Sequence, residues 1–255
     1  MIITSEAIVL HSRKYSDSSN ILTLYTPDRG KVSVIAKGSR KPKSKFGAAV
    51  MPLGIISATY YFKPGRDLQT LSNAETVVPL RVIGESFEHL TTGLAIAESV
   101  NSTTHPDEQN AELYDLLKQS LVALNTAGQN TYAYFVWFTL RLAEVTGFMI
   151  DLHHCAETQL PIVAEPTPEY YFSFADGSPY SQSDSTVQSG YRLTGVTLAL
   201  LQTIAQTGLD DVRNIPVSEQ LRNEIHHFFT NYFSFHLERR FVYRTQKMVL
   251  GNFEL

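Results

Sequence analysis

The chain has 255 residues, of which 43% are hydrophobic, so it can bury the core of one large domain or of two small ones. A single cysteine, Cys155, excludes an internal disulfide framework. No apolar run reaches the ~18 residues of a membrane span, and Met1–Thr4 begin a strand-like pattern rather than a signal peptide. We therefore expect a cytoplasmic protein.

The net charge of −4 hides an uneven distribution along the chain. Residues 1–85 hold twelve Lys and Arg against six Asp and Glu, a net of +6, and the rest holds nine against nineteen, a net of −10. The basic part is suited to a polyanion, whereas the acidic part would repel one and is better suited to protein partners.

The first part of the chain, residues 1–80, has the pattern of a small β-domain. Five short segments are rich in β-branched and aromatic residues and are separated by turn residues, as in Pro27–Gly30 and Lys63–Arg66. The predicted strands are Ile2–His11, Asn20–Thr26, Lys31–Ala36, Ile55–Phe62 and Leu68–Val77. This number of strands in this length is typical of an OB-fold, a barrel that binds oligonucleotides on one face. A β-sandwich fragment or an SH3-like barrel would give the same pattern.

The run from Lys37 to Lys45 is the most informative segment of the chain. It holds five cations and no carboxylate, with Gly, Pro and Ser between them, and it follows a predicted strand. Such a run predicts a mobile cationic loop that contacts phosphates, although a solvated surface loop has the same composition. The candidate DNA-binding residues are Lys37, Arg40, Lys41, Lys43 and Lys45, with Arg13, Lys14, Lys31, Lys63 and Arg66 as extensions of the track.

Four aromatic residues of the same part, Tyr25, Tyr60, Tyr61 and Phe62, are candidates for stacking on bases. Their alternation along the strands means that some of them face the core instead.

Residues 81–255 read as a helical domain with an insertion. Apolar residues recur at helical spacing in Ser86–Ser102, Ala111–Leu124, Thr131–Val145, Thr194–Ala205 and Ser218–Val242. The last segment carries an aromatic stripe that we expect in the core, made of Phe228, Phe229, Tyr232, Phe233 and Phe235. Residues 148–192 contain several prolines and a short strand pattern at Tyr170–Phe174, so we expect a small subdomain there. The predicted fold class is α+β with two domains.

Two segments carry a specific resemblance to a known family. Tyr15–Lys31 contains the elements Asp17, Leu22-Thr23, Thr26 and Gly30 in nearly the spacing of that family, and Ala36–Ser44 reads AKGSRKPKS. Together they resemble the bacterial recombination mediator family RecO. The resemblance implies an N-terminal OB-fold, a C-terminal helical domain and a zinc-finger-like insertion. It also implies binding of single- and double-stranded DNA, strand annealing and help in loading the recombinase. The implied partners are RecR and the acidic tail of single-strand binding protein.

The insertion departs from the family pattern of two Cys-x-x-Cys pairs. Only Cys155 is present, since position 158 is threonine and Tyr180–Ser183 stands where a second pair would fall. One thiolate beside His153 and His154 does not make a structural zinc site. We therefore expect no metal and no cofactor, and an insertion held by packing of Tyr170, Tyr171, Phe172 and Phe174.

The C-terminal part holds a second candidate site, for a protein partner. Relatives bind the acidic tail of single-strand binding protein near their last helix, and here four cations fall on its predicted final turns and just beyond: Arg239, Arg240, Arg244 and Lys247. Arg240, Arg244 and Lys247 would share one helix face. Phe241, Val242 and Tyr243 would supply apolar contacts, and Arg141 a further cation. Favourable charge at a helix C-terminus explains the same residues without a partner.

Nothing in the sequence indicates an enzyme. No phosphate-binding Gly-rich loop, dinucleotide motif or metalloprotease motif is present, and the adjacent residues His154 and Cys155 rarely point at each other. Two alternatives to a mediator remain open: a generic single-stranded nucleic-acid-binding OB protein without mediator activity, and a scaffold whose basic part docks an acidic protein.

Overall fold

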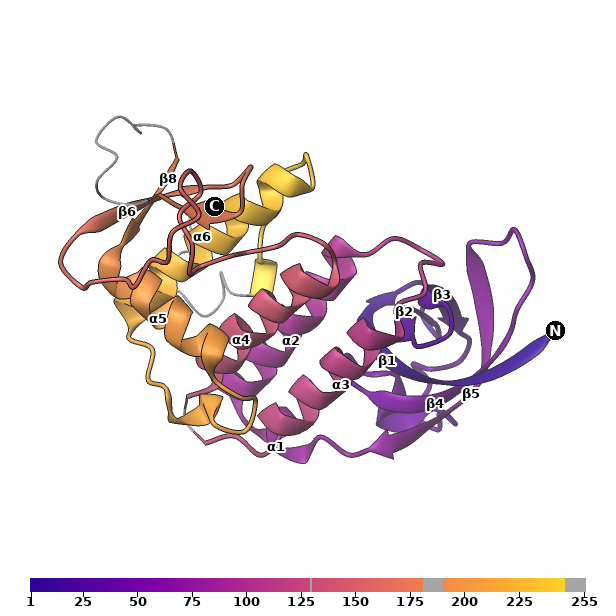
Figure 1. The fold of residues 1–255 in the computed structure, drawn as a ribbon. Coiled ribbons are helices and arrows are strands. Elements are labelled where there is room, and N and C mark those ends of the chain that lie inside the picture. Colours follow the sequence, from indigo (N-terminus) through magenta and orange to yellow (C-terminus); the bar gives the residue numbers. More distant parts are fainter. Residues whose placement is uncertain (129, 181–189, 246–255) are drawn as a thin grey trace. The chain divides into compact units, whose positions relative to one another are not determined.

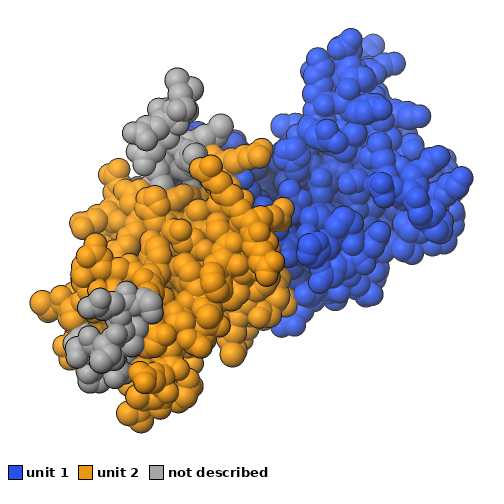
Figure 2. All heavy atoms as spheres, turned by 90° about the horizontal axis from the view of Figure 1, so that it is seen from above, with its two compact units in different colours: residues 1–126 blue, residues 127–255 orange. Residues whose placement is uncertain are grey.

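The computed structural model describes residues 1–128, 130–180 and 190–245 (Figure 1). Its contacts divide the chain into two compact units, residues 1–126 and 127–255 (Figure 2). The sequence-based division after residue 80 separates strands from helices. The division by contacts instead groups the first helices with the strands.

The first unit contains a closed five-stranded barrel in the order β1-β2-β3-β5-β4. Neighbouring strands are antiparallel except β3 and β5, which are parallel. The strands are β1 (Ile2–Lys14), β2 (Asn20–Thr26), β3 (Gly30–Ala36), β4 (Ile55–Tyr61) and β5 (Leu68–Val78). The predicted OB-like barrel is thereby confirmed, with strand ends displaced by up to three residues.

The barrel core follows from the period of two along each strand. In β3 the side chains of Val32, Val34 and Ala36 are buried, and the residues between them are partly exposed. The buried set joins Leu22 and Leu24 of β2 inside the barrel. A 3-10 turn, η1 (Gly47–Val50), contributes further apolar residues to the same cluster.

Three helices complete the first unit: α1 (Arg81–Glu85), α2 (Phe87–Thr103) and α3 (Ala111–Leu124). The short α1 was not predicted from the sequence. The N-terminus of α2 is capped by the Ser86 hydroxyl and that of α3 by the Asn110 side chain, which accepts a 2.9 Å hydrogen bond from Leu113 N. In this unit thirteen Lys and Arg face twelve Asp and Glu, a net of +1, so the positive charge belongs to the barrel and not to the helices.

Gly30 brings the loop between α2 and α3 against the turn between β2 and β3. Its φ of 56° lies in the left-handed region, and a Cβ there would sit 1.9 Å from the carbonyl oxygen of Glu108. Any other residue would push this loop away from the barrel.

The second unit holds three helices and a small sheet. The helices are α4 (Thr131–Val145), α5 (Gly195–Gln206) and α6 (Glu219–His236), with a 3-10 turn, η2 (Val212–Asn214), before α6. The sheet has the order β7-β6-β8, formed by β6 (Glu169–Ser173), β7 (Ser178–Pro179) and β8 (Tyr191–Thr194). The insertion is therefore a three-stranded subdomain, and its predicted strand corresponds to β6.

The prediction that the last helix continues to Val242 is wrong. Helix α6 ends at His236, and Glu238 has a φ of 50°. Beyond that residue Phe241 N donates to the Ser234 hydroxyl at 3.0 Å, and the chain buries Phe241 and Tyr243. The burial of these two rings against the α6 and α4 aromatics outweighs continuation of the helix.

The aromatic stripe of α6 forms the core of the second unit. Phe228, Phe229, Tyr232 and Phe233 are fully buried, as expected, whereas Phe235 is 51% exposed, so its assignment to the core is wrong. The insertion packs onto this stripe: the Phe172 ring lies 5.0 Å from that of Phe228.

Candidate nucleic-acid interface

The cationic loop, residues 37–45, leaves β3 as a succession of turns. Lys41 N donates to Gly38 O at 3.2 Å and Ser44 N to Lys41 O at 3.0 Å. The loop is joined to the turn between β1 and β2, because Arg40 N donates to Ser18 O at 3.1 Å and Asn20 N to the Ser39 hydroxyl. The loop predicted as mobile thus has a hydrogen-bonded backbone that fixes where its side chains start.

Four of its cations project from this backbone as exposed residues: Lys37, Arg40, Lys41 and Lys43. Within the described part of the chain none of the four forms an ion pair. The fifth, Lys45, donates from Nζ to the Ser72 carbonyl and lies 5.1 Å from the centre of the Phe46 ring. Lys45 therefore anchors the loop to β5.

Arg13 and Lys14 lie at the same end of the barrel as the cationic loop. Lys14 pairs with Asn20 across β1 and β2, and Asn20 pairs with Ala36, the residue before the loop. Arg13 is exposed, and Lys14 forms an exposed 3.4 Å ion pair with Asp17. The structure thus brings these two candidates together with the loop.

Lys63 and Arg66 lie toward the opposite end of β3. They belong to the loop between β4 and β5, and Leu68, which follows, pairs with Ser33 of β3. Gln69 fixes this loop: its Nε2 donates to the carbonyls of Lys63 and Arg66, and its Oε1 accepts from Lys63 N. Both cations are exposed.

The ammonium group of Lys31 is hydrogen-bonded within the protein. Its Nζ donates 2.7 Å hydrogen bonds to the carbonyls of Asn101 and Thr104 at the C-terminal end of α2. A cation suits this position, because the last carbonyls of a helix carry partial negative charge. The structure therefore gives Lys31 a structural role.

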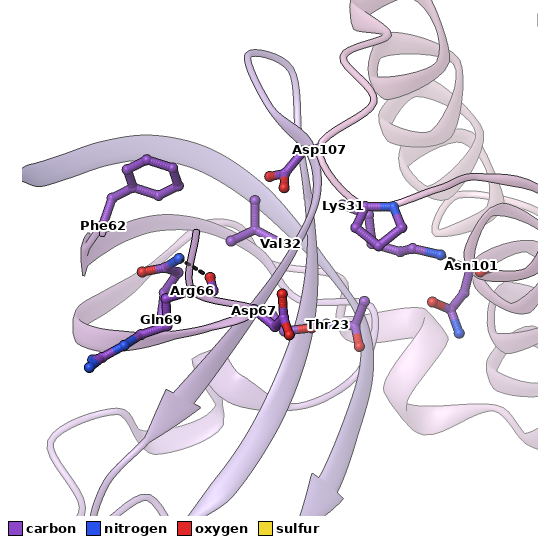
Figure 3. Close-up of a pocket in the computed structure, with 11 residues that line it drawn as sticks. Thr23, Lys31, Val32, Phe62, Arg66, Asp67, Gln69, Asn101 and Asp107 are labelled. Carbon is purple, nitrogen blue, oxygen red and sulfur yellow. Dashed lines mark hydrogen bonds between the residues drawn. The ribbon is translucent and has the colours of Figure 1, made fainter. Parts of the chain in front are cut away.

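A pocket of about 220 Å³ lies where β2 and β3 meet the loop between β4 and β5 (Figure 3). We call it the barrel pocket. In Figure 3 the ring of Phe62 lies at one end of it, and Lys31 with Asn101 at the other. Its lining residues are Thr23, Lys31, Val32, Ser33, Phe62, Arg66, Asp67, Gln69, Asn101, Pro106 and Asp107.

The four aromatic candidates separate into core and surface. Tyr25 and Tyr60 are fully buried, and burial raises the pKa of both hydroxyls. Tyr61 is 54% exposed, and Phe62 is partly buried at the barrel pocket. Arg29, which the sequence reasoning did not select, lies with its guanidinium 4.1 Å from the centre of the Phe62 ring. Its place in a turn gave no sign of this contact with the residue that follows β4.

The partner-site candidates of the second unit are dispersed. Arg141 donates to Glu144 at 3.0 Å and to the Ala205 carbonyl at 2.8 Å. Arg239, Arg240 and Arg244 are exposed, but since α6 ends at His236 they do not share a helix face. Lys247 lies outside the described residues. The rings of Phe241 and Tyr243 are buried in the core and offer no apolar surface to a partner.

Side-chain hydrogen bonds hold the start of the insertion. The Asp151 carboxylate accepts from His153 N and from His154 N and Nδ1. Burial alone would raise the pKa of Asp151, but these hydrogen bonds outweigh it and lower the pKa. Gln202 of α5 donates to the carbonyls of Leu152 and Ile162.

These donors do not fit a four-thiolate zinc site. Cys155 is buried, and His154 is turned to Asp151. Across residues 1–128, 130–180 and 190–245, no three His, Cys, Asp or Glu side chains come together as metal ligands. Ser181–Ser183, part of the segment where a second pair would fall, lie outside the described residues.

Comparison with known proteins decides the family. Residues 1–80 match the family model for the recombination protein O N terminal, and residues 84–244 match that for its C terminal. The chain belongs to the RecO family. A DNA repair protein RecO of Salinibacter ruber is 29% identical over 248 residues, covering 97% of this chain and 93% of that protein. One of Pelodictyon phaeoclathratiforme is 30% identical over 246 residues, covering 93% and 94%.

Membership of the RecO family agrees with the predicted function class, DNA repair and recombination. The N-terminal model ends at residue 80, where the barrel gives way to helices. Within the part of the chain that the structure describes, no helix is long and apolar enough to cross a membrane.

Proposed function

We propose that this chain is a recombination mediator that binds single- and double-stranded DNA through its barrel and anneals complementary strands. With RecR it would help to load the recombinase on DNA coated by single-strand binding protein, whose acidic tail it would bind through the second unit. The proposal rests on membership of the RecO family and on the exposed cations gathered at one end of the OB-like barrel.

The cationic loop supplies the observation that carries DNA binding. Four exposed cations on a hydrogen-bonded backbone, with Arg13 beside them, can neutralise phosphates of either strand without reading sequence. Annealing needs that neutralisation because two bare strands repel each other. It needs no covalent step, so we propose an activity without catalytic residues or cofactors, exerted at the nucleoid.

The first experiment is equilibrium binding of a random-sequence single strand over a range of salt concentrations. If about six phosphates are neutralised, the logarithm of the affinity should fall with the logarithm of salt at a slope of roughly −4. Replacing Lys41 and Lys43 by Ala should make the slope less steep by about 0.7 for each phosphate that is no longer neutralised. The matched control replaces two exposed cations of the second unit, Arg192 and Arg213, by Ala. An affinity that does not respond to salt would contradict the proposal.

The second experiment separates a mediator from a generic single-strand-binding OB protein. The rate of annealing of complementary strands is measured on bare DNA and on DNA coated with single-strand binding protein. A mediator should anneal both, whereas the alternative should bind bare strands and leave coated strands apart. If the protein binds bare strands but does not anneal strands coated with single-strand binding protein, the result would favour a generic single-strand-binding OB protein.

A further inference from the structure

The barrel pocket has two walls that are fixed before any ligand arrives. One wall is the loop between β4 and β5, which Gln69 holds by three hydrogen bonds to Lys63 and Arg66. The other is the segment after α2, where Asp107 N donates to Lys31 O at 3.3 Å. Because both walls are tied to the backbone of neighbouring elements, the pocket is a preformed cavity (Figure 3).

The charges around the pocket disfavour a phosphate. Asp67 and Asp107 contribute two exposed carboxylates to its lining. The lining also holds two cations, the exposed Arg66 and Lys31, whose Nζ donates to two carbonyls. Since the two signs balance in the lining, an anion gains less here than at the cationic loop, which holds cations and no carboxylate. The pocket suits a neutral group that donates hydrogen bonds.

The pocket also offers a planar surface. Phe62 lines it, and the Arg29 guanidinium lies over the Phe62 ring at 4.1 Å. Unpaired bases stack on aromatic rings and on guanidinium planes, and such stacking contributes about 1–3 kcal/mol per base. Of the parts of a DNA strand, the base alone is neutral, planar and rich in hydrogen-bond donors.

We propose that the barrel pocket holds one unpaired nucleobase of a bound strand and prefers bases with an exocyclic amine. This inference rests on the proposed DNA binding of the same barrel. Cytosine, adenine and guanine each present an amine that the carboxylate of Asp67 or Asp107 can accept. Thymine and uracil have no amine, and their one ring donor, N3–H, lies between the carbonyl oxygens at C2 and C4, which repel a carboxylate that approaches it. The pocket thereby adds a base preference to a track that otherwise reads only phosphates.

The test compares oligo(dC) with oligo(dU), whose bases differ only at ring positions 3 and 4. Affinities of the full chain are measured at equal strand length and fixed salt, by fluorescence anisotropy. We expect oligo(dC) to bind about fivefold more tightly, the effect of one hydrogen bond to a charged acceptor in a partly exposed site. Asp67→Asn and Asp107→Asn should each bring the ratio of the two affinities close to one.

Asp17→Asn is the matched control, because it removes the same charge from the barrel outside the pocket. This variant should bind oligo(dC) and oligo(dU) more tightly by the same factor, so the ratio of the two affinities should stay as in the wild type. Asparagine also tolerates the φ of 60° at position 107, so that variant preserves the backbone. Equal wild-type affinities, or a ratio unchanged by both pocket variants, would overturn the base pocket while leaving DNA binding intact. Failure of both strands to bind would overturn the proposed function as well.

Discussion

The hydroxyl of Tyr114 in α3 donates a 2.6 Å hydrogen bond to the carboxylate of Glu6 in β1. Nζ of Lys118, one turn further along α3, binds the same carboxylate oxygen at 2.6 Å. One strand residue is thereby joined to two residues of a helix more than a hundred positions later. Part of the attachment of α3 to the barrel depends on this single charge.

This arrangement predicts an acid-sensitive contribution to stability. Burial alone would raise the pKa of Glu6, but the hydrogen bonds from Lys118 and Tyr114 and the charge of Lys118 lower it below the ordinary 4.5. A carboxyl whose pKa is lowered by folding stabilises the protein above its unfolded pKa and loses that effect as pH falls through the folded pKa. Glu6→Gln should therefore lower the free energy of unfolding by about 1–2 kcal/mol at neutral pH.

Urea unfolding measured from neutral to acidic pH tests this prediction. The difference between wild type and Glu6→Gln should shrink as the pH falls below about 4.5, because the Glu6 carboxylate of the unfolded chain takes up its proton first. It should vanish once the pH is below the lowered pKa of Glu6 in the folded protein. Glu85→Gln, which neutralises an exposed carboxylate of α1, should leave stability nearly unchanged. A difference that stays constant over the whole range would show that charge is not its source.

A second prediction separates two lysines that the sequence placed on one track. Lys31 bonds to two carbonyls at the end of α2, whereas Lys41 is exposed on the cationic loop. Lys31→Met should lower the free energy of unfolding by about 1–3 kcal/mol, because two carbonyls lose a charged donor. Under conditions where Lys31→Met is folded, the affinity of this variant for single-stranded DNA should match that of the wild type. Lys41→Met should show the reverse, a lower affinity with unchanged stability.

Thermal unfolding and anisotropy on the same samples decide between these roles. If Lys31→Met weakened DNA binding as much as Lys41→Met does, while remaining equally stable, its assigned structural role would be wrong.

The strands of the barrel were predicted well because each is marked by residues within or next to it. The alternation in Lys31–Ala36 and the turn at Pro27–Gly30 do not depend on distant residues, and these strands were placed within one residue. The end of α6 was missed because it depends on tertiary packing: Phe241 and Tyr243 find partners in Phe233 and Phe135, which no local pattern reveals.

The same limit applies to the site. Composition identified the cationic loop, but Lys31 and Lys41 look alike in the sequence. Only the position of the α2 carbonyls, about seventy residues later in the chain, distinguishes them. Arg29 and Phe62 are likewise separated along the chain and meet only when β4 closes the barrel.

A third prediction concerns the insertion. Nε2 of Gln202 donates to Leu152 O at 2.7 Å and to Ile162 O at 2.9 Å, and its Oε1 accepts from Ala164 N at 3.1 Å. Gln202→Leu would leave three backbone groups without these partners, so it should lower the free energy of unfolding by about 2 kcal/mol or more. Because Cys155 is the only thiol, a zinc chelator should leave the melting temperature of the wild type unchanged.

Melting curves with and without chelator, together with zinc analysis of the purified protein, test both statements. Thr203→Val is the control, since Thr203 is an exposed residue of the same helix and its hydroxyl donates to Ala199 O within that helix. One tightly held zinc per chain would refute the metal-free insertion, and an unaltered melting temperature for Gln202→Leu would refute its role as a clamp.

The last prediction concerns the acidic tail of single-strand binding protein. Arg240 is exposed just after the end of α6, and Arg244 is exposed four residues later. Since these residues do not share a helix face, their attraction for an acidic peptide is expected to be long-range and salt-dependent. Replacing both by Glu should weaken binding of a tail peptide at least tenfold, which corresponds to about 1.4 kcal/mol. Binding of bare DNA, which depends on the barrel, should change little.

The control for net charge is the double variant Arg192→Glu and Arg213→Glu, which makes the same charge change elsewhere in the second unit. Equal loss in both double variants would mean that overall charge attracts the tail, and undiminished binding in the Arg240 and Arg244 variant would move the site elsewhere.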